Sequence, residues 1–343
     1  MPVDDPRILE LRAMREKVRQ GGGQQRIATQ HAKGKLTARE RLDLLLDSGT
    51  FNELEPYIVN QGDEMGLSTT QYPGDGVVTG YGLIDGRTVY VYAQDFTIYG
   101  GTLGEMHSHK ICRIIDLAVR NGAPVIGLLD SGGARIQEGV KSLGGYAEIF
   151  RRNALYSGVV PQISLLLGPC AGGAAYSPAL TDLIIMVEKT SFMFLTGPDV
   201  IKAVTGEVID AESLGGAEVH MSISGTASLC TPTEAEALAL CRRVLSYLPS
   251  NNVENPPYIA TADDPMRMDA ELNSIIPLDS STPYQMHEVI ERVVDYGSFL
   301  ELQPTWAGNA IVGLARIGGH SVELWSDWSG KLLCSLHLDH DEV

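Results

Sequence analysis

Two glycine-rich segments hold the residues of this sequence whose types and spacing could do chemistry. Residues 128–139 read Leu-Leu-Asp-Ser-Gly-Gly-Ala-Arg-Ile-Gln-Glu-Gly, and residues 167–178 read Leu-Gly-Pro-Cys-Ala-Gly-Gly-Ala-Ala-Tyr-Ser-Pro. In each, glycines stand where an apolar strand is expected to pass into a helix. Because glycine has no Cβ, a ligand can approach the unpaired N–H groups at the helix start, where the helix dipole favours negative charge. Two such N–H groups aimed at one oxygen would form an oxyanion hole.

The sequence patterns of three other chemistries do not occur in these segments. No G-x-G-x-x-G follows a predicted strand, and there is no G-x-x-x-x-G-K-[ST], so neither dinucleotide nor P-loop nucleotide binding is indicated. Asp130-Ser131-Gly132 is not a G-x-S-x-G elbow, which argues against a serine hydrolase. No base follows Cys170 at the spacing of a nucleophile pair. The alternative that the glycines only permit tight packing of an α/β sheet stays open.

The charge of the chain is unevenly distributed. The net charge of −17 argues against a nucleic-acid partner, because phosphate binding favours a basic surface. Residues 1–41, however, hold ten of the 26 Lys and Arg residues. A basic start on an acidic protein fits a site for a compact polyanion. For residues 7–19 a solvated amphipathic helix is the alternative.

The five cysteines are dispersed and contain no C-x-x-C pair. This spacing argues against a disulfide framework and a zinc ribbon, so we expect no metal. No apolar run approaches the roughly 18 to 20 residues of a membrane span, and the N-terminus has no apolar signal region. We therefore expect a cytoplasmic protein with no membrane partner.

The elements that position the two segments can be predicted from periodicity and turn residues. Helices are expected at residues 6–20, 37–46 and 234–247, the second with a capping box of Thr37 and Glu40. Asp85-Gly86 predicts a hairpin between two strands. Apolar strands alternating with helices predict a parallel sheet covered on both faces. The expected strands are residues 76–84, 87–93, 125–129, 162–167, 183–187 and 192–194.

One stretch of sequence occurs twice. Residues 45–54, Leu-Leu-Asp-Ser-Gly-Thr-Phe-Asn-Glu-Leu, reappear at 293–302 as Val-Val-Asp-Tyr-Gly-Ser-Phe-Leu-Glu-Leu. A duplicated fold is the simplest explanation, with chance similarity of two hairpins as the alternative. Further on, matching residues continue: Gly80, Ile84, Gly86 and Val89 against Gly313, Ile317, Gly319 and Val322.

The second copy stops being recognisable at Val322. The residues that follow include Trp325 and Trp328 and have an acidic end. We expect a foreign or frame-shifted tail there, and a natural short variant is the alternative. The predicted divisions are a first domain at 1–255, a linker at 256–275, the incomplete start of a second domain at 276–322, and an aberrant or disordered tail at 323–343.

Five motifs in order resemble those of the β-type subunits of biotin-dependent acyl-CoA carboxyltransferases. This group includes propionyl-CoA carboxylase, methylmalonyl-CoA decarboxylase and the transcarboxylase large subunit. The resemblance runs from about residue 6 to 322 and implies an α/β, crotonase-like (ClpP/crotonase) domain of repeated ββα units followed by the start of a similar domain. The motifs are Gln-His-Ala-Lys-Gly-Lys-Leu-Thr-Ala-Arg-Glu-Arg at 30–41, Gly-Asp-Gly-Val-Val-Thr-Gly at 74–80, Asp-Ser-Gly-Gly-Ala-Arg-Ile-Gln-Glu-Gly at 130–139, Gly-Pro-Cys-Ala-Gly-Gly at 168–173 and Phe-Leu-Thr-Gly-Pro-Asp at 194–199.

The resemblance implies a set of site residues. Gly172 and Gly173 would be the catalytic oxyanion pair. Acyl-CoA would contact the neighbouring turns, and three cations would bind the CoA phosphates. The implied substrate-binding residues are Gly100, Gly101, Gly132, Gly133, Ala134, Arg135, Ala171, Lys33, Lys35 and Arg39. Thr226-Ala227-Ser228 replaces the family's usual Val-Ala-His, so no role is assigned to a histidine there.

The implied reaction moves a carboxyl group between carboxybiotin and a short-chain acyl-CoA. Met266-Arg267-Met268 lacks the lysine of a biotin acceptor, so biotin would be carried by a separate carrier protein or biotin carboxylase subunit. The full-length family protein would be a homohexamer without a metal in this subunit. The alternatives are a truncated, non-catalytic CoA-binding or assembly fragment and a crotonase-type hydratase or thioesterase using Glu105 and Glu138.

Overall fold

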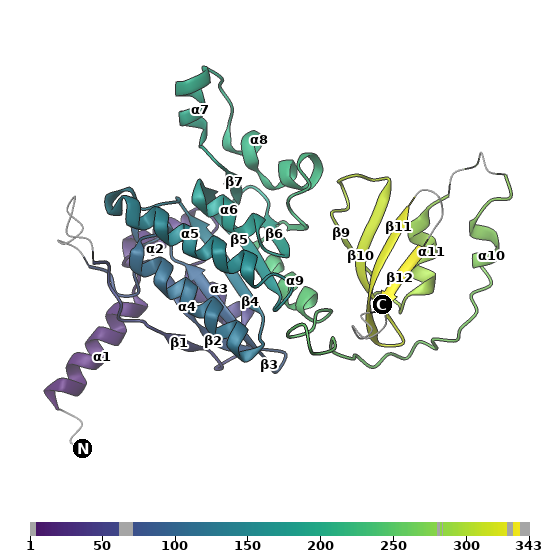
Figure 1. Cartoon of the computed structure of the whole chain (residues 1–343), viewed down its shortest axis with the longest axis horizontal. Helices are drawn as coiled ribbons and strands as arrows, with labels where there is room; N and C mark the ends of the chain where they lie inside the picture. Colours follow the sequence, from purple (N-terminus) through teal and green to yellow (C-terminus); the bar gives the residue numbers. More distant parts are fainter. Residues whose placement is uncertain (1–4, 62–70, 280–281, 283, 328–331, 337–343) are drawn as a thin grey trace.

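The alternating apolar strands form an eight-stranded sheet in the first part of the chain (Figure 1). The computed structural model describes residues 5–61, 71–279, 282, 284–327 and 332–336. The strand order is β1-β2-β3-β4-β5-β6-β8, with β7 paired to β5. The first three strands are antiparallel, and all pairings from β3 onward are parallel. The strands are β1 (Asn52–Leu54), β2 (Val77–Ile84), β3 (Arg87–Gln94), β4 (Val125–Ser131), β5 (Gln162–Ala171), β6 (Leu183–Val187), β7 (Phe192–Phe194) and β8 (Leu229–Thr231).

Helices cover both faces of this sheet, as the apolar strands predict. One core contains residues of α3 and α9, and the core on the other face contains residues of α4, α5 and α6. β4 is buried along its whole length. The helices of this part are α1 (Pro6–Arg19), α2 (Gln24–Ala32), α3 (Ala38–Leu45), α4 (Glu105–Asn121), α5 (Val140–Leu155), α6 (Gly173–Ala179), α7 (Pro198–Thr205), α8 (Ala211–Gly215) and α9 (Glu234–Leu245), with short turns of helix at η2 (Tyr99–Gly101), η3 (Ile136–Glu138) and η4 (Val219–Ile223).

The predicted capping box and hairpin are both confirmed. Thr37 Oγ1 accepts the N–H of Glu40, and Glu40 Oε2 accepts the N–H of Thr37 at 2.8 Å. Ile84 pairs with Arg87 across the Asp85-Gly86 turn. Helix α2 was not expected, because Gly21–Gly23 mark the end of α1 and the polar sequence that follows has little apolar periodicity.

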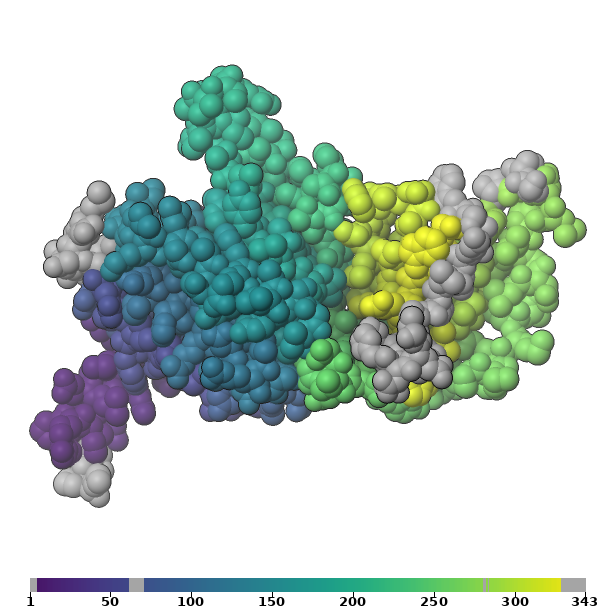
Figure 2. All heavy atoms as spheres, in the orientation of Figure 1, coloured from purple at the N-terminus to yellow at the C-terminus, as the bar shows by residue number. Residues whose placement is uncertain are grey.

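Two parts of the chain stand out from the body of the first unit. Helix α1 extends away from the sheet at one end, and α7 and α8 project from it near β7 (Figures 1 and 2). No residue of α7 is buried. None of the helices in the described ranges is long and apolar enough to cross a membrane.

A second, smaller unit contains a four-stranded antiparallel sheet and α11. Leu300 and Leu314 join the core that contains Leu238 of α9. Across the same boundary the hydroxyl of Tyr247 donates to the carbonyl of Ser298 at 2.5 Å. The two units therefore share a packed interface. The elements of the second unit are α10 (Leu272–Ile275), α11 (Met286–Val293), β9 (Leu300–Leu302), β10 (Ala310–Ile317), β11 (His320–Asp327) and β12 (Leu332–Leu336).

The predicted change of structure at residue 323 falls inside β11. Val322, Leu324 and Ser326 are buried, whereas Glu323 and Trp325 are exposed, which is the alternation of a strand with one face on a core. Disorder was therefore the wrong expectation for residues 323–327 and for the backbone of 332–336, which pairs with β11. The rest of the predicted tail lies outside the described residues, and its foreign origin stays a prediction.

Candidate functional site

The two glycine-rich turns lie side by side at the carboxyl ends of β4 and β5. These strands are parallel neighbours, and Ser131 pairs with Cys170 at their ends. The approach is so close that a Cβ atom at Gly133 would lie 2.6 Å from the carbonyl oxygen of Ala171. The sequence predicted two similar turns, and the parallel register brings them together.

The N–H of Gly172 is not free. It donates to the carbonyl of Phe194 at 3.1 Å, because β7 pairs with the end of β5 and extends that ladder by one hydrogen bond. Gly172 itself has a φ of 57° and a ψ of −124°, a conformation that favours glycine. The prediction that Gly172 and Gly173 together provide the oxyanion pair is therefore wrong for Gly172, whose role is to make the turn.

Three N–H groups of these turns donate to no acceptor within the described part of the chain. Two belong to Gly173 and Ala174, the first residues of α6, where no preceding helical turn supplies a carbonyl. The third belongs to Ala134 in the turn after β4. The other amides of that turn are used, since Gly132 donates to the carbonyl of Gly100 at 3.0 Å and Gly133 to the hydroxyl of Ser131 at 3.1 Å.

The loop after β3, which holds Gly100 and Gly101, packs against the same turn; their predicted contact with acyl-CoA stays a prediction. Besides the hydrogen bond from Gly132 to Gly100, a Cβ atom at Gly101 would lie 2.1 Å from the carbonyl oxygen of Asp130. Only glycine allows this approach, so the loop is fixed directly on the end of β4.

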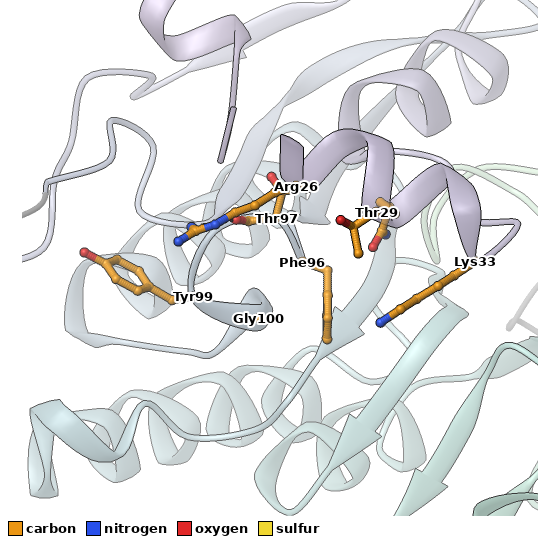
Figure 3. Close-up of a pocket in the computed structure, with 8 residues that line it drawn as sticks. Arg26, Thr29, Lys33, Phe96, Thr97, Tyr99 and Gly100 are labelled. Atoms are coloured by element: carbon orange, nitrogen blue, oxygen red, sulfur yellow. Dashed lines mark hydrogen bonds between the residues drawn. The ribbon is translucent and has the colours of Figure 1, made fainter. Parts of the chain in front are cut away.

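A cavity of about 300 Å³ lies between α2 and this loop (Figure 3). Two cations, Arg26 and Lys33, and two aromatic rings, Phe96 and Tyr99, are on its walls. Lys33 was a predicted phosphate ligand, and its ammonium has no partner among the described residues. Arg26 was not singled out in the sequence, where only its place among the ten N-terminal cations pointed to it. The cavity is lined by Arg26, Thr29, Gln30, Lys33, Phe96, Thr97, Tyr99 and Gly100.

The other two predicted phosphate ligands are held by carboxylates of the protein. Lys35 Nζ donates to Asp130 at 2.7 Å, and burial lowers the pKa of Lys35. Both guanidinium nitrogens Nη1 and Nη2 of Arg39 donate to Glu53, at 2.9 and 2.8 Å. Both cations are thus already paired with carboxylates, so the structure gives no support to the prediction that Lys35 and Arg39 bind CoA phosphates.

Lys35 belongs to a buried network of four charges. Asp130 also accepts from Arg41 at 3.0 Å and from the amide of Gln30 at 3.1 Å. Arg41 in turn donates to Glu234 at 2.7 and 2.8 Å. All four charged side chains are nearly inaccessible to solvent, and two positive charges balance two negative ones. Such a network tolerates burial because each charge is paired. It joins α3 to the end of β4 and to α9.

Arg135, a predicted substrate ligand, is also used inside the protein. Its Nη1 donates to Asp75 at 2.6 Å and to Glu138 at 2.7 Å, and its Nη2 donates to the carbonyl of Thr102 at 2.8 Å. Burial raises the pKa of Asp75 to about 6, although Arg135 acts in the opposite direction. Arg135 is thus a buried structural cation, which corrects its predicted role.

The structure does not support acid–base catalysis by Glu105 and Glu138 or nucleophilic catalysis by Cys170. Glu138 accepts from Arg135 and from the N–H of Glu105 at 2.6 Å, while Glu105 pairs with Lys141, so the two carboxylates are not a free acid–base pair. Cys170 is buried, and burial raises the pKa of its thiol. Within the described residues no group of His, Cys, Asp and Glu could hold a metal ion.

The comparison with protein families decides what kind of chain this is. The carboxyl transferase domain model matches residues 29–324. The chain belongs to the carboxyl transferase domain family. Its fold is that of the crotonase-like carboxyltransferases: the structure matches transcarboxylase 12S, solved as a hexamer with methylmalonyl-CoA bound, with a TM-score of 0.92 and 43% identity over 95% of this chain and 63% of that one.

Curated members of the carboxyl transferase family are similar over nearly the whole chain. The carboxyltransferase subunit of propionyl-CoA carboxylase from Haloferax mediterranei is 56% identical over 94% of this chain and 62% of its own length. The methylmalonyl-CoA decarboxylase subunit alpha from Propionigenium modestum is 51% identical over 99% of this chain and 66% of its own length. This carboxyl transferase chain thus spans about three fifths to two thirds of the length of these relatives.

Proposed function

We propose that this chain takes part in moving a carboxyl group between carboxybiotin and a short-chain acyl-CoA of the propionyl-CoA or methylmalonyl-CoA type. The observation that carries the proposal is that the N–H groups of Ala134, Gly173 and Ala174, on two adjacent turns, have no acceptor in the part of the chain that the structure describes. Family membership supports the same reaction class.

The unpaired N–H groups suit a reaction in which a carbonyl oxygen becomes negative. When the α-carbon of an acyl thioester loses its proton, charge develops on the thioester oxygen. Backbone N–H groups already held in place, from Ala134 and Gly173, would stabilise that enolate without reorganising. In other enzymes the loss of one such donor costs about 3 to 4 kcal/mol of transition-state stabilisation.

Carboxybiotin on a separate protein would supply CO₂ by losing its carboxyl group, and the ureido nitrogen freed in this way would accept the α-proton. Negative charge would then fall on the ureido oxygen, and the N–H of Ala174, which has no acceptor among the described residues, would be available to it. The chain itself would bind the acyl-CoA, orient its thioester and exclude water. No titrating side chain needs to act in this scheme, in agreement with the engaged state of Glu105 and Glu138.

The cavity beside the turns fits the nucleotide end of CoA. Arg26 and Lys33 would attract the phosphates, and the ring of Phe96, with Lys35 on one of its faces, would offer the adenine ring an aromatic surface (Figure 3). The cavity reaches the turns through Gly100, whose carbonyl accepts from Gly132. A pantetheine arm would therefore lead from the cavity toward Ala134 and Gly173.

Isothermal titration with CoA and a carboxyl-transfer assay with methylmalonyl-CoA as carboxyl donor and free biotin as acceptor, followed by the propionyl-CoA that is left, test the proposal. We expect CoA binding that is weakened in Lys33→Ala and unchanged in the control Lys202→Ala, which removes the same charge from the exposed face of α7. Failure of the wild-type chain to bind CoA would refute the proposal.

A second candidate function uses only the cavity beside α2, with Arg26, Lys33 and Phe96, and not the N–H groups of the two turns. The chain would then bind CoA, or assemble with copies of itself or a biotin carrier protein, without catalysing transfer. CoA binding with no carboxyl exchange at high protein concentration would favour this candidate. Carboxyl transfer that depends on added biotin would exclude the non-catalytic candidate.

A further inference from the structure

The carboxylate of Asp130 connects the N-terminal helices to the first glycine-rich turn. Asp130 is the residue before Ser131 and lies at the end of β4. Its three side-chain donors are Gln30, Lys35 and Arg41, at 3.1, 2.7 and 3.0 Å. All three come from α2, α3 and the segment between them. No solvent reaches Asp130, so it cannot touch a substrate.

Residues of the CoA cavity take part in this connection. Gln30 lines the cavity and donates to Asp130. On the opposite wall, the centroid of the Phe96 ring lies 4.6 Å from Lys35 Nζ. The wall formed by the loop after β3 is also attached to the turn after β4, because the N–H of Gly132 donates to the carbonyl of Gly100. Both walls of the cavity in Figure 3 are therefore attached to residues 130–132.

We propose that Asp130 is a positioning residue that couples occupation of the cavity to the ordering of the turn at residues 131–134. The inference rests on the proposed function, because it takes the nucleotide end of CoA as the occupant. A ligand that bridges α2 and the loop restricts Gln30 and Phe96. Because Gln30 donates to Asp130 and the ring of Phe96 contacts Lys35, the same ligand would also restrict Asp130 and, through the chain, the N–H of Ala134.

The consequence is that a part of the substrate far from the reacting bond contributes to the reaction. Binding energy gained at Arg26 and Lys33 would be used to fix Ala134 in the geometry that stabilises the enolate. The nucleotide would thus raise the rate of the chemical step and not only the affinity for the substrate.

Hydrogen exchange of the turn with a probe that cannot reach it tests the coupling. The probe is adenosine 3′,5′-bisphosphate, which carries the nucleotide end of CoA without the pantetheine arm. Titration calorimetry gives its affinity, and mass spectrometry follows amide exchange in the peptide of residues 128–139. In the wild-type chain we expect saturating probe to slow exchange at residues 131–135 by about threefold or more.

Two matched substitutions on α2 separate coupling from binding. Gln30→Met removes the hydrogen bond to Asp130, together with a longer one to the carbonyl of Leu36, but keeps the volume and leaves Lys35 and Arg41 in place. At a probe concentration that saturates this variant, set from its own measured affinity, we expect the slowing at 131–135 to be lost. Gln25→Met makes the same change at an exposed position of the same helix, and this control should keep the slowing. Phe96→Leu, a second test variant if Gln30→Met does not fold, should reduce the slowing even at a probe concentration that saturates this variant by its own measured affinity.

The outcomes are distinguishable. Probe binding without slower exchange in the wild-type chain would overturn the coupling and leave the proposed function intact. If the probe slows amide exchange at residues 131–135 equally in Gln30→Met and in the wild-type chain, the hydrogen bond from Gln30 to Asp130 does not carry the coupling. Absence of probe binding to the wild-type chain would overturn the placement of CoA in the cavity, and the coupling with it.

Discussion

Asp47 and Asp295 hold two distant hairpin turns in the same way. Asp47 accepts the N–H groups of Asp85 and Gly86 at 3.2 and 2.9 Å, and Asp295 accepts those of Gly318 and Gly319 at 2.9 and 2.7 Å. The two sets occupy matching places in the repeated sequence. A chance resemblance of two hairpins would not reproduce this side-chain contact, so the finding supports duplication of the unit.

The buried member of this pair is expected to matter more for stability. Asp295→Ala should lower the free energy of unfolding by about 1 to 3 kcal/mol, because it leaves two N–H groups of a turn without their charged acceptor. Asp47→Ala should cost less, since Asp47 is more exposed. Urea unfolding at pH 7 measures both. Equal effects of the two substitutions would contradict the role assigned to burial.

The two lysines that flank Gly34 should respond in opposite ways to substitution. Lys33→Ala should weaken CoA binding by about tenfold, the effect of losing one charge-assisted contact, and leave unfolding unchanged. Lys35→Ala should lower the free energy of unfolding by about 3 to 5 kcal/mol, because Asp130 loses a buried partner. Calorimetric titration and urea unfolding of both variants check the contrast. If Lys33→Ala unfolds the chain and Lys35→Ala does not, the assignment of the two side chains is reversed.

Gly173 is packed against an aromatic ring. A Cβ atom there would lie 2.7 Å from Cδ2 of Tyr146, so Gly173→Ala should lower the free energy of unfolding by about 1 to 3 kcal/mol through overpacking. Tyr146→Leu in the same chain should recover part of that loss. The double-mutant cycle, measured by urea unfolding, gives the coupling. Additive effects of the two substitutions would show that the ring does not limit this position.

Much of the fold can be predicted from the sequence because its signals are local. The apolar runs at 183–187 and 192–194 became β6 and β7 with the predicted bounds, and Thr37 with Glu40 formed the predicted cap. Helix α2 could not be predicted, since its polar residues have no clear periodicity and contact the rest of the fold through Gln30 and Arg26.

The candidate site was predictable in position but not in detail. Local sequence identifies the two turns, yet the partner that occupies each polar group comes from elsewhere in the chain. The carboxylates that hold Lys35 and Arg135 lie 95 and 60 positions away, and the carbonyl that occupies the N–H of Gly172 belongs to Phe194 of the next strand but one. A single sequence shows that a charged side chain or a backbone N–H is present. It does not show whether another part of the fold already pairs with that group.

His107 should make stability depend on pH between 5 and 7.5. The imidazole is fully buried beside Arg135 and Lys110, and burial lowers its pKa well below the ordinary 6.5. Its Nδ1 lies 3.0 Å from the carbonyl oxygen of Asp75, which can only accept, so Nδ1 carries the proton of a neutral ring. In the unfolded chain the ring takes up a second proton below about pH 6.5. The folded state therefore loses about 1.4 kcal/mol per pH unit as pH falls below that value.

Comparison with His107→Gln isolates this contribution. Glutamine can still donate to the carbonyl of Asp75 but does not titrate, so the wild-type chain should be the more stable at pH 7.5 and should lose that advantage toward pH 5. The raised pKa of Asp75 acts in the other direction, because a protonated Asp75 favours the folded state below about pH 6. That effect is common to both chains and cancels in their difference to first order. Urea unfolding at half-unit steps of pH measures the difference, and parallel curves would mean that His107 does not stay neutral in the folded protein.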